Sequence, residues 1–328
     1  MKKMVDIAIS LTKRLSDFGR SAESVAVIER AIEANAWFAE GDICRSVEAI
    51  RSQMLDPHKI SAWLAAYPAP PRTVTRRIAI IMAGNIPLVG IFDLICTLAS
   101  GHEAWIKPSS KDSVLIEYIC ALLQEIDPDI PIYIYDESQS YDAFIATGGE
   151  EANLYFTHRY QGVKQLCRSN RHSIAVLNGD ETSEQLDLLA HDIYTYSGLG
   201  CRNVAMIFAP KGHKVEIPKG NVSKKYRNNY MQTKALLTIR GQAYEDNQTS
   251  IIIRSQELPT TLSTITLWEY DAIEQVEEWI SLHDQKLQCI VSNVIKHPRQ
   301  VDFGQAQHPT LFDYADGVDT MKFLDFND

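Results

Sequence analysis

From residue 77 onward, short apolar runs alternate with stretches of helical periodicity. RRIAIIM (76–82), EAWIK (103–107), IPIYIYD (130–136) and DAFIAT (142–147) have the length and composition of buried strands. Between the second and third of them, SVLIEYICALLQEI (113–126) places apolar residues at helical spacing. Strands that alternate with helices are joined in parallel, because a parallel pair needs a long crossover. The pattern predicts a doubly wound α/β sheet.

A second set of strands and helices follows. Its strands are HSIAVLNG (172–179), VAMIFAP (204–210), SIIIR (250–254), STITLWEY (263–270) and QCIVSNV (288–294). Thr182 and Gln185 form a plausible capping box at the start of a helix, polar residues 225–242 suggest another helix, and AIEQVEEWISLH (272–283) a third. The alternation in VDTMKFLDF (318–326) predicts an edge strand. Residues 1–66 carry helical periodicity and end at the turn-rich YPAPPR (67–72).

A chain of 328 residues is longer than a single core usually spans. We therefore predict two lobes with an added helical segment. Residues 1–70 are a helical segment packed on the cofactor lobe, residues 71–179 a Rossmann-like cofactor lobe, residues 180–302 a second lobe, and residues 303–328 a tail with an edge strand. The N-terminus begins with basic residues but soon carries Asp6, Lys13 and Asp17, which predicts an amphipathic helix and not a signal peptide.

Composition excludes several classes of function. The formal net charge is −10, which gives a nucleic-acid role no electrostatic support. No apolar run approaches the roughly 18 residues of a membrane span. The cysteines form no CxxC pair and the nine histidines no HxxxH, so neither a disulfide framework nor a metal site is expected. Six scattered cysteines suit a reducing cytoplasm.

The first candidate site residue, Asn85, lies in MAGNIPL, between a predicted strand and an apolar helix. Ligands of α/β proteins bind at such turns, at the carboxyl end of a parallel sheet. The Asn85 amide could face a developing oxyanion. Gly84-Asn85 also suits a plain turn and helix cap, which is the commoner use of this dipeptide.

Two further segments follow strands of the same predicted sheet. In WIKPSSK, Lys107 could bond ribose hydroxyls, and Ser110 and Lys111 could hold a 2′-phosphate. In ATGGEE, Gly148 and Gly149 lead into a helix whose N-terminal N–H groups suit a pyrophosphate. Plain alternatives remain at both places: a solvated lysine before a Pro-Ser helix start, and acidic residues that cap a helix dipole.

Cys201 stands in SGLGCRN, between a predicted helix and a predicted strand. Small residues before a thiol leave room for a substrate carbonyl, and a nearby arginine or backbone N–H groups favour the thiolate. The other cysteines, which lie in apolar patterns, are predicted to fill the core. Cys201 is therefore a candidate nucleophile, although most cysteines in proteins are structural.

Taken in order, these four segments resemble the aldehyde dehydrogenase superfamily over residues 77–325. AGNIPLVGIFDL, SSKD, YSGLGCRNV and DYADGVDTMKFL are most similar to the LuxC-type acyl-CoA reductases, the fatty-acid reductases of bacterial bioluminescence, and to shorter bacterial homologues. The resemblance implies an aldehyde-dehydrogenase-like α/β fold, with two doubly wound parallel-sheet lobes and a helical N-terminal segment.

The resemblance also implies roles for single residues. Cys201 matches the catalytic cysteine, and Asn85 the oxyanion-hole asparagine that acts with the backbone N–H of that cysteine. Lys107 and Ser109 match the KPS segment at the adenosine ribose, and Gly148 and Gly149 fall where the family turns beneath the pyrophosphate. Glu257 in SQELP looks like the glutamate at the nicotinamide ribose, although the Phe-Gly-Pro that follows it in the family is absent.

One departure from the family concerns the hydrolytic glutamate of aldehyde dehydrogenases. Val176 in AVLNG is expected at its position, and valine cannot activate water. An acyl-enzyme that resists water fits exchange with another thiol. The chain is also shorter than typical members of the superfamily, which leaves the size of the substrate tunnel open.

The sequence thus predicts NADPH-dependent reduction of an acyl-CoA or acyl-carrier thioester to an aldehyde, of the long-chain fatty-acyl type. Two alternatives stay open: an acyl-phosphate reductase, which a cluster of arginines would favour, and a homologue that binds an acyl carrier or nucleotide without turnover. The sequence leaves open the acyl chain length, the thioester donor and the oligomeric state, with a homodimer as one candidate assembly.

Overall fold

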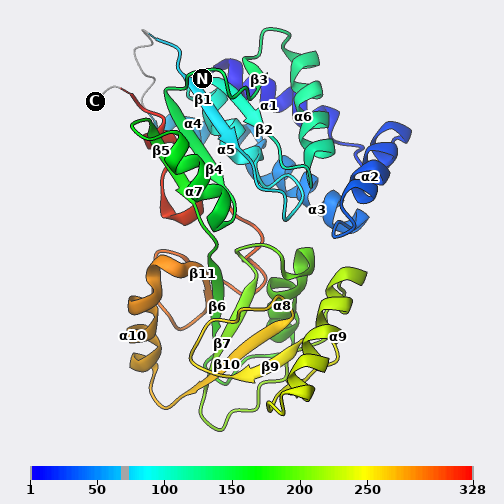
Figure 1. The fold of residues 1–328 in the computed structure, drawn as a ribbon, viewed down its shortest axis with the longest axis vertical. Coiled ribbons are helices and arrows are strands. Elements are labelled where there is room, and N and C mark those ends of the chain that lie inside the picture. Colours follow the sequence, from blue (N-terminus) through cyan, green and yellow to red (C-terminus); the bar gives the residue numbers. More distant parts are fainter. Residues whose placement is uncertain (1, 68–73, 327–328) are drawn as a thin grey trace. The chain divides into compact units, whose positions relative to one another are not determined.

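The computed structural model describes residues 2–67 and 74–326, and it divides into two compact units. The first unit combines residues 1–170 with residues 310–328, and the second comprises residues 171–309. The turn expected at 67–72 falls largely on residues 68–73, outside the described residues, as does the boundary expected between residues 70 and 71. Figure 1 shows the elements of each unit.

The first unit is built on a parallel sheet of five strands in the order β3-β2-β1-β4-β5. Its strands are β1 (Arg77–Ile81), β2 (Glu103–Lys107), β3 (Ile132–Ile134), β4 (Ala143–Thr147) and β5 (Lys164–Arg168). Its helices are α1 (Lys2–Arg14), α2 (Ala22–Ala34), α3 (Glu40–Ala49), the π-helical turn η1 (Ile50–Met54), α4 (Pro57–Ala65), α5 (Ile91–Ala99), α6 (Ser113–Ile126), α7 (Glu150–Arg159), the short turn η4 (Ala315–Gly317) and α11 (Thr320–Phe323).

Alternation along β1 explains why both faces of this sheet are covered. Ile78 and Ile80 point into one apolar cluster, which also takes side chains from α1, α5 and α6. Ala79 points into another, which takes Phe156 of α7. Because strand side chains alternate between faces, a run of apolar residues such as RIAII suits a strand buried on both sides.

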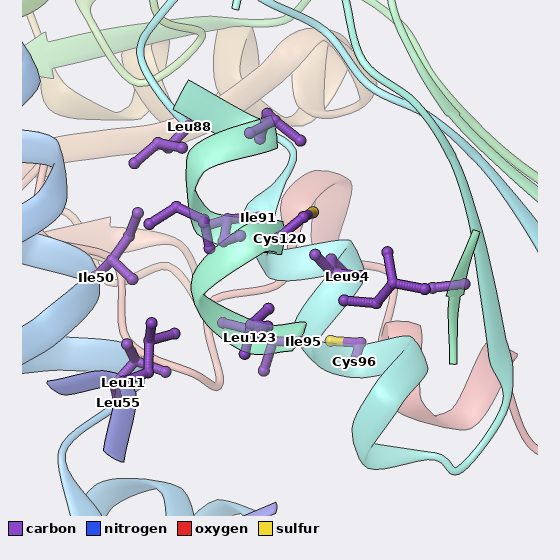
Figure 2. Packing of buried hydrophobic residues seen from close by; sticks show 14 of the residues in the cluster. Leu11, Ile50, Leu55, Leu88, Ile91, Leu94, Ile95, Cys96, Cys120 and Leu123 are labelled. Atoms are coloured by element: carbon purple, nitrogen blue, oxygen red, sulfur yellow. The ribbon is translucent and has the colours of Figure 1, made fainter. Parts of the chain in front are cut away.

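The N-terminal helices belong to the first unit. Leu11 of α1, Ile50 of η1 and Leu55 lie in the same buried cluster as Ile95 of α5 and Leu123 of α6, as Figure 2 shows. Burial of a leucine or isoleucine side chain stabilises a fold by roughly 1.5 to 3 kcal/mol. These contacts anchor the helical segment on α5 and α6.

The second unit contains a sheet of seven strands in the order β12-β11-β6-β7-β10-β9-β8, parallel except for β8. Its strands are β6 (His172–Val176), β7 (Val204–Pro210), β8 (Glu245–Asp246), β9 (Ile251–Arg254), β10 (Thr264–Tyr270), β11 (Leu287–Ser292) and β12 (Gln300–Val301). Its helices are α8 (Ser183–Tyr194), η2 (Thr195–Gly198), α9 (Lys224–Ile239), α10 (Ile273–His283) and η3 (Asp284–Lys286). In Figure 1, α10 covers one face, while α8 and α9 cover the other. The predicted capping box at Thr182 and Gln185 is confirmed.

Residues 318–326 do not form the predicted edge strand; this part of the tail is described from residue 310 to residue 326. Residues 310–326 contain η4 and α11, because Met321 and Leu324 are buried at a spacing of three, which is helical. The tail also donates and accepts hydrogen bonds within the first unit. The Tyr314 hydroxyl accepts a hydrogen bond from the Trp63 indole N–H at 2.7 Å, and the Thr320 hydroxyl accepts one from the Arg168 guanidinium at 2.8 Å. The Leu324 carbonyl oxygen lies 3.0 Å from His102 Nε2.

The unit boundaries also differ from the expected residues 179 and 303. HSIAVLNG starts the second unit, since β6 pairs with β7 and β11. The fifth strand of the first sheet is β5, which the sequence pattern did not reveal because Lys164, Gln165 and Arg168 interrupt its apolar run.

Candidate active site

The sheet order brings three of the predicted segments to adjacent strand ends. Asn85 follows β1, Lys107 ends β2 and Gly148 follows β4, and β1 pairs with both β2 and β4. From β1 the chain adds β2 and β3 on one side of the sheet and then β4 and β5 on the other side of β1. The strand order therefore reverses between β1 and β4, and ligands of such sheets bind at this switch point. The structure therefore brings these residues to one edge of the first unit.

The turn that carries the exposed Asn85 is fixed by its neighbours. A Cβ on Gly84 would lie 2.7 Å from Cβ of Ser109, so only glycine permits this close approach of the two segments. Leu88 has a left-handed backbone (φ 59°), unusual for leucine, and its side chain is buried in the apolar cluster of Figure 2. Its N–H donates to Asp112 Oδ2 at 2.7 Å.

Asp112 is a buried carboxyl beneath this turn. Its exposed fraction is 2%, and its Oδ1 has no hydrogen-bond partner among the described residues. Burial raises the pKa of Asp112 to about 8, and the Leu88 N–H lowers it by a smaller amount. Asp112 is therefore protonated and neutral near pH 7. It is the aspartate of the SSKD segment.

Replacing Asp112 with asparagine should remove a pH dependence of stability. Because the folded pKa lies above the unfolded value near 3.8, the contribution of this proton to stability is complete below about pH 4 and is lost as the pH rises to about 8. The free energy of unfolding should thus fall by on the order of 1 kcal/mol per pH unit within this window. Urea unfolding at several pH values should show that the free energy of unfolding falls less with pH in Asp112→Asn than in the wild type.

A matched control for this experiment is Asp136→Asn. The exposed Asp136 accepts the Ser138 N–H, and this bond lowers its pKa, so it titrates below the window. The same pH dependence in the wild type and in Asp112→Asn would contradict the assignment.

Lys107 is held at the end of β2 by aromatic side chains. Its Nζ lies 5.3 Å from the ring centres of both Tyr135 and Phe156. It also lies 3.9 Å from Oε1 of Glu137, a half-exposed carboxylate that sequence reasoning did not identify. Glu137 follows the short edge strand β3, and no sequence motif marks this position as part of a site.

The serine and lysine segment is attached to the N-terminal helices. Asn35, at the end of α2, donates its Nδ2–H to the carbonyl oxygen of Lys111 at 3.2 Å. The Lys111 N–H donates to Ser109 Oγ at 3.3 Å, while the side chains of Ser110 and Lys111 are exposed. The backbone is therefore ordered and both exposed side chains can meet a ligand.

Gly148 and Gly149 form the turn into α7. The Gly148 N–H donates to the Arg168 carbonyl oxygen at 3.4 Å, and Asn153 Nδ2 donates to the same oxygen at 2.7 Å. No atom of the described residues lies within 4 Å of a Cβ built on Gly149. The N-terminus of α7 is thus open to an approaching group, as a phosphate site requires.

Cys201 is exposed in the turn between α8 and β7, in the second unit. Tyr196, Ser197 and Gly198 have consecutive left-handed backbones, with φ of 55°, 53° and 68°. The buried side chain of Asn203 closes this turn through hydrogen bonds to α8 and to Gly200. The sequence motif therefore forms a constrained turn that presents the thiol to solvent.

The other thiols differ in exposure. Cys96, Cys120 and Cys289 are buried and Cys44 is half-buried, as predicted for core cysteines. Burial raises the pKa of Cys120 to about 12 and raises the pKa values of Cys44 and Cys96, which disfavours their thiolates. The prediction was wrong for Cys167, which is exposed because β5 is an edge strand and this side chain points outward.

A cavity of about 150 Å³, here called the loop cavity, lies beside the cysteine turn. Gly198, Gly200 and Asn203 of the turn line it, together with Arg171 and His172. No aspartate or glutamate is among the described residues that line it. Cys201 itself is not among the lining residues either.

Glu257 does not line the loop cavity. It is exposed beyond the carboxyl end of β9 and lines a separate cavity of about 280 Å³ with Leu236 and Arg240 of α9. Cys201, in contrast, precedes the amino end of β7. The structure therefore does not bring these two residues of the second unit together.

The expected role of Val176 was wrong. Val176 pairs with Phe208 whereas Ser173 pairs with Val204, so it lies roughly 13 Å along the strand from the Cys201 end. Its side chain is fully buried in the apolar cluster with Phe208 and Trp279. A carboxylate at this position could not reach an acyl group on Cys201.

The described residues, 2–67 and 74–326, contain neither a candidate metal site nor a candidate membrane-spanning helix. No group of three or more His, Cys, Asp or Glu side chains in them could hold a metal ion. None of their helices has the length and apolar character needed to cross a bilayer.

The chain was compared with models of known protein families and with curated proteins. The sequence model of the family described as acyl-CoA reductase (LuxC) matches residues 50–228, which is more than half of the chain. The match includes Asn85, Lys107, Gly148 and Cys201, and ends before Glu257. No curated protein matches the chain.

Solved structures show the same fold at low identity. A double mutant of betaine aldehyde dehydrogenase from Staphylococcus aureus, in complex with NAD+, has 13% identity and a TM-score of 0.60, over 90% of this chain and 76% of that one. An oxidoreductase from Marinobacter aquaeolei has 13% identity and a TM-score of 0.63, over 94% of this chain and 78% of that one. Aldehyde dehydrogenase 21 from Physcomitrella patens, in complex with the reaction product succinate, has 10% identity and a TM-score of 0.59, over 84% of this chain and 70% of that one. The predicted aldehyde-dehydrogenase-like α/β fold is confirmed.

Proposed function

Because the chain belongs to the LuxC family of acyl-CoA reductases, we propose that it reduces an acyl thioester to an aldehyde with NADPH, through an acyl-enzyme on Cys201. The family and the fold are those of oxidoreductases that act on acyl or aldehyde groups. The long-chain fatty-acyl type, the thioester donor and the cofactor are our proposal.

The observation that carries the proposal is the state of Cys201. It is exposed in a turn that several side chains hold in place, whereas the thiols of Cys96, Cys120 and Cys289 are buried. A nucleophile must meet its substrate in a fixed geometry, and a structural thiol need not. The match of the family over the same turn supports the same residue.

In the proposed reaction, the Cys201 thiolate attacks the thioester carbonyl and a carbon–sulfur bond forms. We assign stabilisation of the resulting oxyanion to the Asn85 amide. The bond to the coenzyme A sulfur then breaks, and the released thiolate takes up a proton. The acyl group stays on Cys201 as a thioester.

The first unit has the residues that NADPH would need. Lys107 and Ser109 would meet the adenosine ribose, Ser110 and Lys111 the 2′-phosphate, and the Gly148-Gly149 turn the pyrophosphate. The open approach to Gly149 and the exposed Lys111 side chain fit a phosphorylated dinucleotide. When bound, the cofactor supplies the hydride that releases the acyl group as an aldehyde. Glu257 at the nicotinamide ribose remains a proposal.

An acyl-phosphate substrate stays an alternative, which a cluster of arginines beside the acyl site would favour. Arg202 follows Cys201 directly, and Arg171 lines the loop cavity beside the cysteine turn. The six cysteines, all within the described residues, form no disulfide, which suits the reducing cytoplasm that we propose as the location. A homodimer stays a prediction.

The proposal is tested by intact mass after the enzyme is mixed with a panel of acyl-CoAs and with an acyl phosphate. We expect one acyl adduct, mapped to Cys201, that forms from acyl-CoA and disappears with aldehyde production when NADPH is added. An adduct from the acyl phosphate alone would favour the alternative reductase. Dinucleotide or acyl-carrier binding without any adduct would favour a non-catalytic homologue.

Lys111→Glu should reduce the preference for NADPH over NADH. A charged contact to the 2′-phosphate is worth about 1.5 to 3 kcal/mol, so the ratio of kcat/KM values should fall by roughly 10- to 100-fold. Glu137→Gln is the matched opposite, since it removes the carboxylate beside Lys107 and should raise the ratio. A wild type that prefers NADH, or a Lys111→Glu ratio equal to that of the wild type, would refute this assignment.

A further inference from the structure

The peptide groups on both sides of Cys201 are held by side chains. The Gly200 N–H donates to Asn203 Oδ1 at 2.8 Å, and the Asn203 N–H donates to the Gly200 carbonyl oxygen at 3.0 Å. The Cys201 carbonyl oxygen accepts the Ser173 hydroxyl at 2.9 Å. These lengths are those of good hydrogen bonds. The Asn203 side chain therefore fixes the Gly200 N–H, and its backbone N–H fixes the carbonyl group of the peptide that precedes the cysteine.

The same asparagine side chain also binds the end of α8. Its Nδ2 lies 3.1 Å from the carbonyl oxygens of Asp192 and Ile193 and 2.9 Å from that of Thr195. The last carbonyl groups of a helix lack the N–H partners of a following turn and need other donors. One side chain thus joins the end of α8 to the residue before Cys201.

The backbone between these two ends needs such support. Tyr196 and Ser197 have left-handed backbones, which residues with a Cβ rarely adopt. Strained conformations persist where the surrounding structure fixes them. Asn203 is 4% exposed and bonds both ends of the segment, and Ser197 Oγ accepts the Ser223 N–H at 2.9 Å. The strained turn and its support lie directly before the thiol.

We infer that Asn203 is a positioning residue for Cys201, an inference that rests on the proposed function for the identity of the nucleophile. Without its amide, the Gly200 N–H and the α8 carbonyl groups lose their partner and the turn relaxes. The Cys201 sulfur then loses its fixed place. Misplacing a reacting atom by about 1 Å lowers a rate by roughly 100-fold.

The test compares Asn203→Ala with the wild type in two ways. Hydrogen exchange of the peptide that contains residues 196–203 should become faster, because the turn is no longer held. Single-turnover acylation of Cys201 by an acyl-CoA should slow by roughly 10- to 100-fold, while the Kd for NADPH stays unchanged. If Asn203→Ala does not fold, Asn203→Ser is used, since its hydroxyl is too short to reach the α8 carbonyl groups.

Asn247→Ala is the matched control. Asn247 lies in the same unit and its side chain makes hydrogen bonds with Tyr194, Ile217, Thr249 and Ser250. It should lower the melting temperature comparably but leave acylation and exchange at 196–203 as in the wild type. Cys167, exposed in the other unit, is an internal reference whose alkylation rate should not change.

Two results would overturn the inference: unchanged exchange in Asn203→Ala, or faster exchange with acylation within twofold of the wild type. In the second case Asn203 only caps α8. A wild-type protein that no acyl-CoA acylates, with exchange that still depends on Asn203, would instead refute the proposed function and leave the support of the turn standing.

Discussion

Cys201→Ala should lose both acyl-adduct formation and NADPH oxidation, by at least roughly 1,000-fold, while keeping its fold. The side chain is exposed in the turn after α8, so removal of its sulfur leaves no cavity and costs little stability. Intact mass after mixing with acyl-CoA measures the adduct, and absorbance at 340 nm measures NADPH. Circular dichroism checks the fold.

Cys167→Ala is the control for this prediction. Cys167 is the other exposed thiol among the described residues, and it lies on β5 in the first unit. Its loss should leave both activities at wild-type level. An acyl adduct that persists in Cys201→Ala and maps to another cysteine would remove the basis of the proposed function.

Asn85→Ala should lower kcat by roughly 100- to 1,000-fold, which corresponds to about 3 to 4 kcal/mol of lost transition-state stabilisation. The amide is exposed after β1, and the turn around it is held by Gly84, Leu88 and Asp112. These contacts hold the turn in the variant, which should therefore fold. Steady-state kinetics with saturating acyl-CoA and NADPH measures the loss.

Asn85→Asp separates an oxyanion role from a capping role. Aspartate keeps an oxygen acceptor for a turn but lacks the NH₂ donor and adds a negative charge. It should therefore be as inactive as Asn85→Ala. Normal turnover in Asn85→Asp, or a change in protein yield alone in Asn85→Ala, would assign the residue to the turn.

Much of the first sheet could be predicted because its strands are apolar on both faces. RIAII, EAWIK and AFIAT lie between turns and helices with clear periodicity, and the structure places all three in one parallel sheet. The four chemical motifs were also visible, since each combines small residues with one reactive or polar side chain.

Other features depend on tertiary contacts that a local pattern does not contain. The buried Asp112 differs from an exposed aspartate only through the Leu88 N–H and the apolar residues above it. The partnership of Asn203 with α8 spans several residues of left-handed backbone that no sequence rule specifies. Val176 was misplaced because alignment to a short motif ignores the strand register, which sets its distance from Cys201.

The return of residues 310–328 to the first unit has a consequence for synthesis on the ribosome. Residues 171–309 leave the exit tunnel before the segment that supplies Tyr314, Thr320 and Leu324 to the earlier unit. The second unit can thus fold first, before Trp63, His102 and Arg168 can make their hydrogen bonds to residues 314–324. Maturation of this protein should therefore be completed after translation has passed residue 309, and a stall before that point would leave the N-terminal half as a client for chaperones.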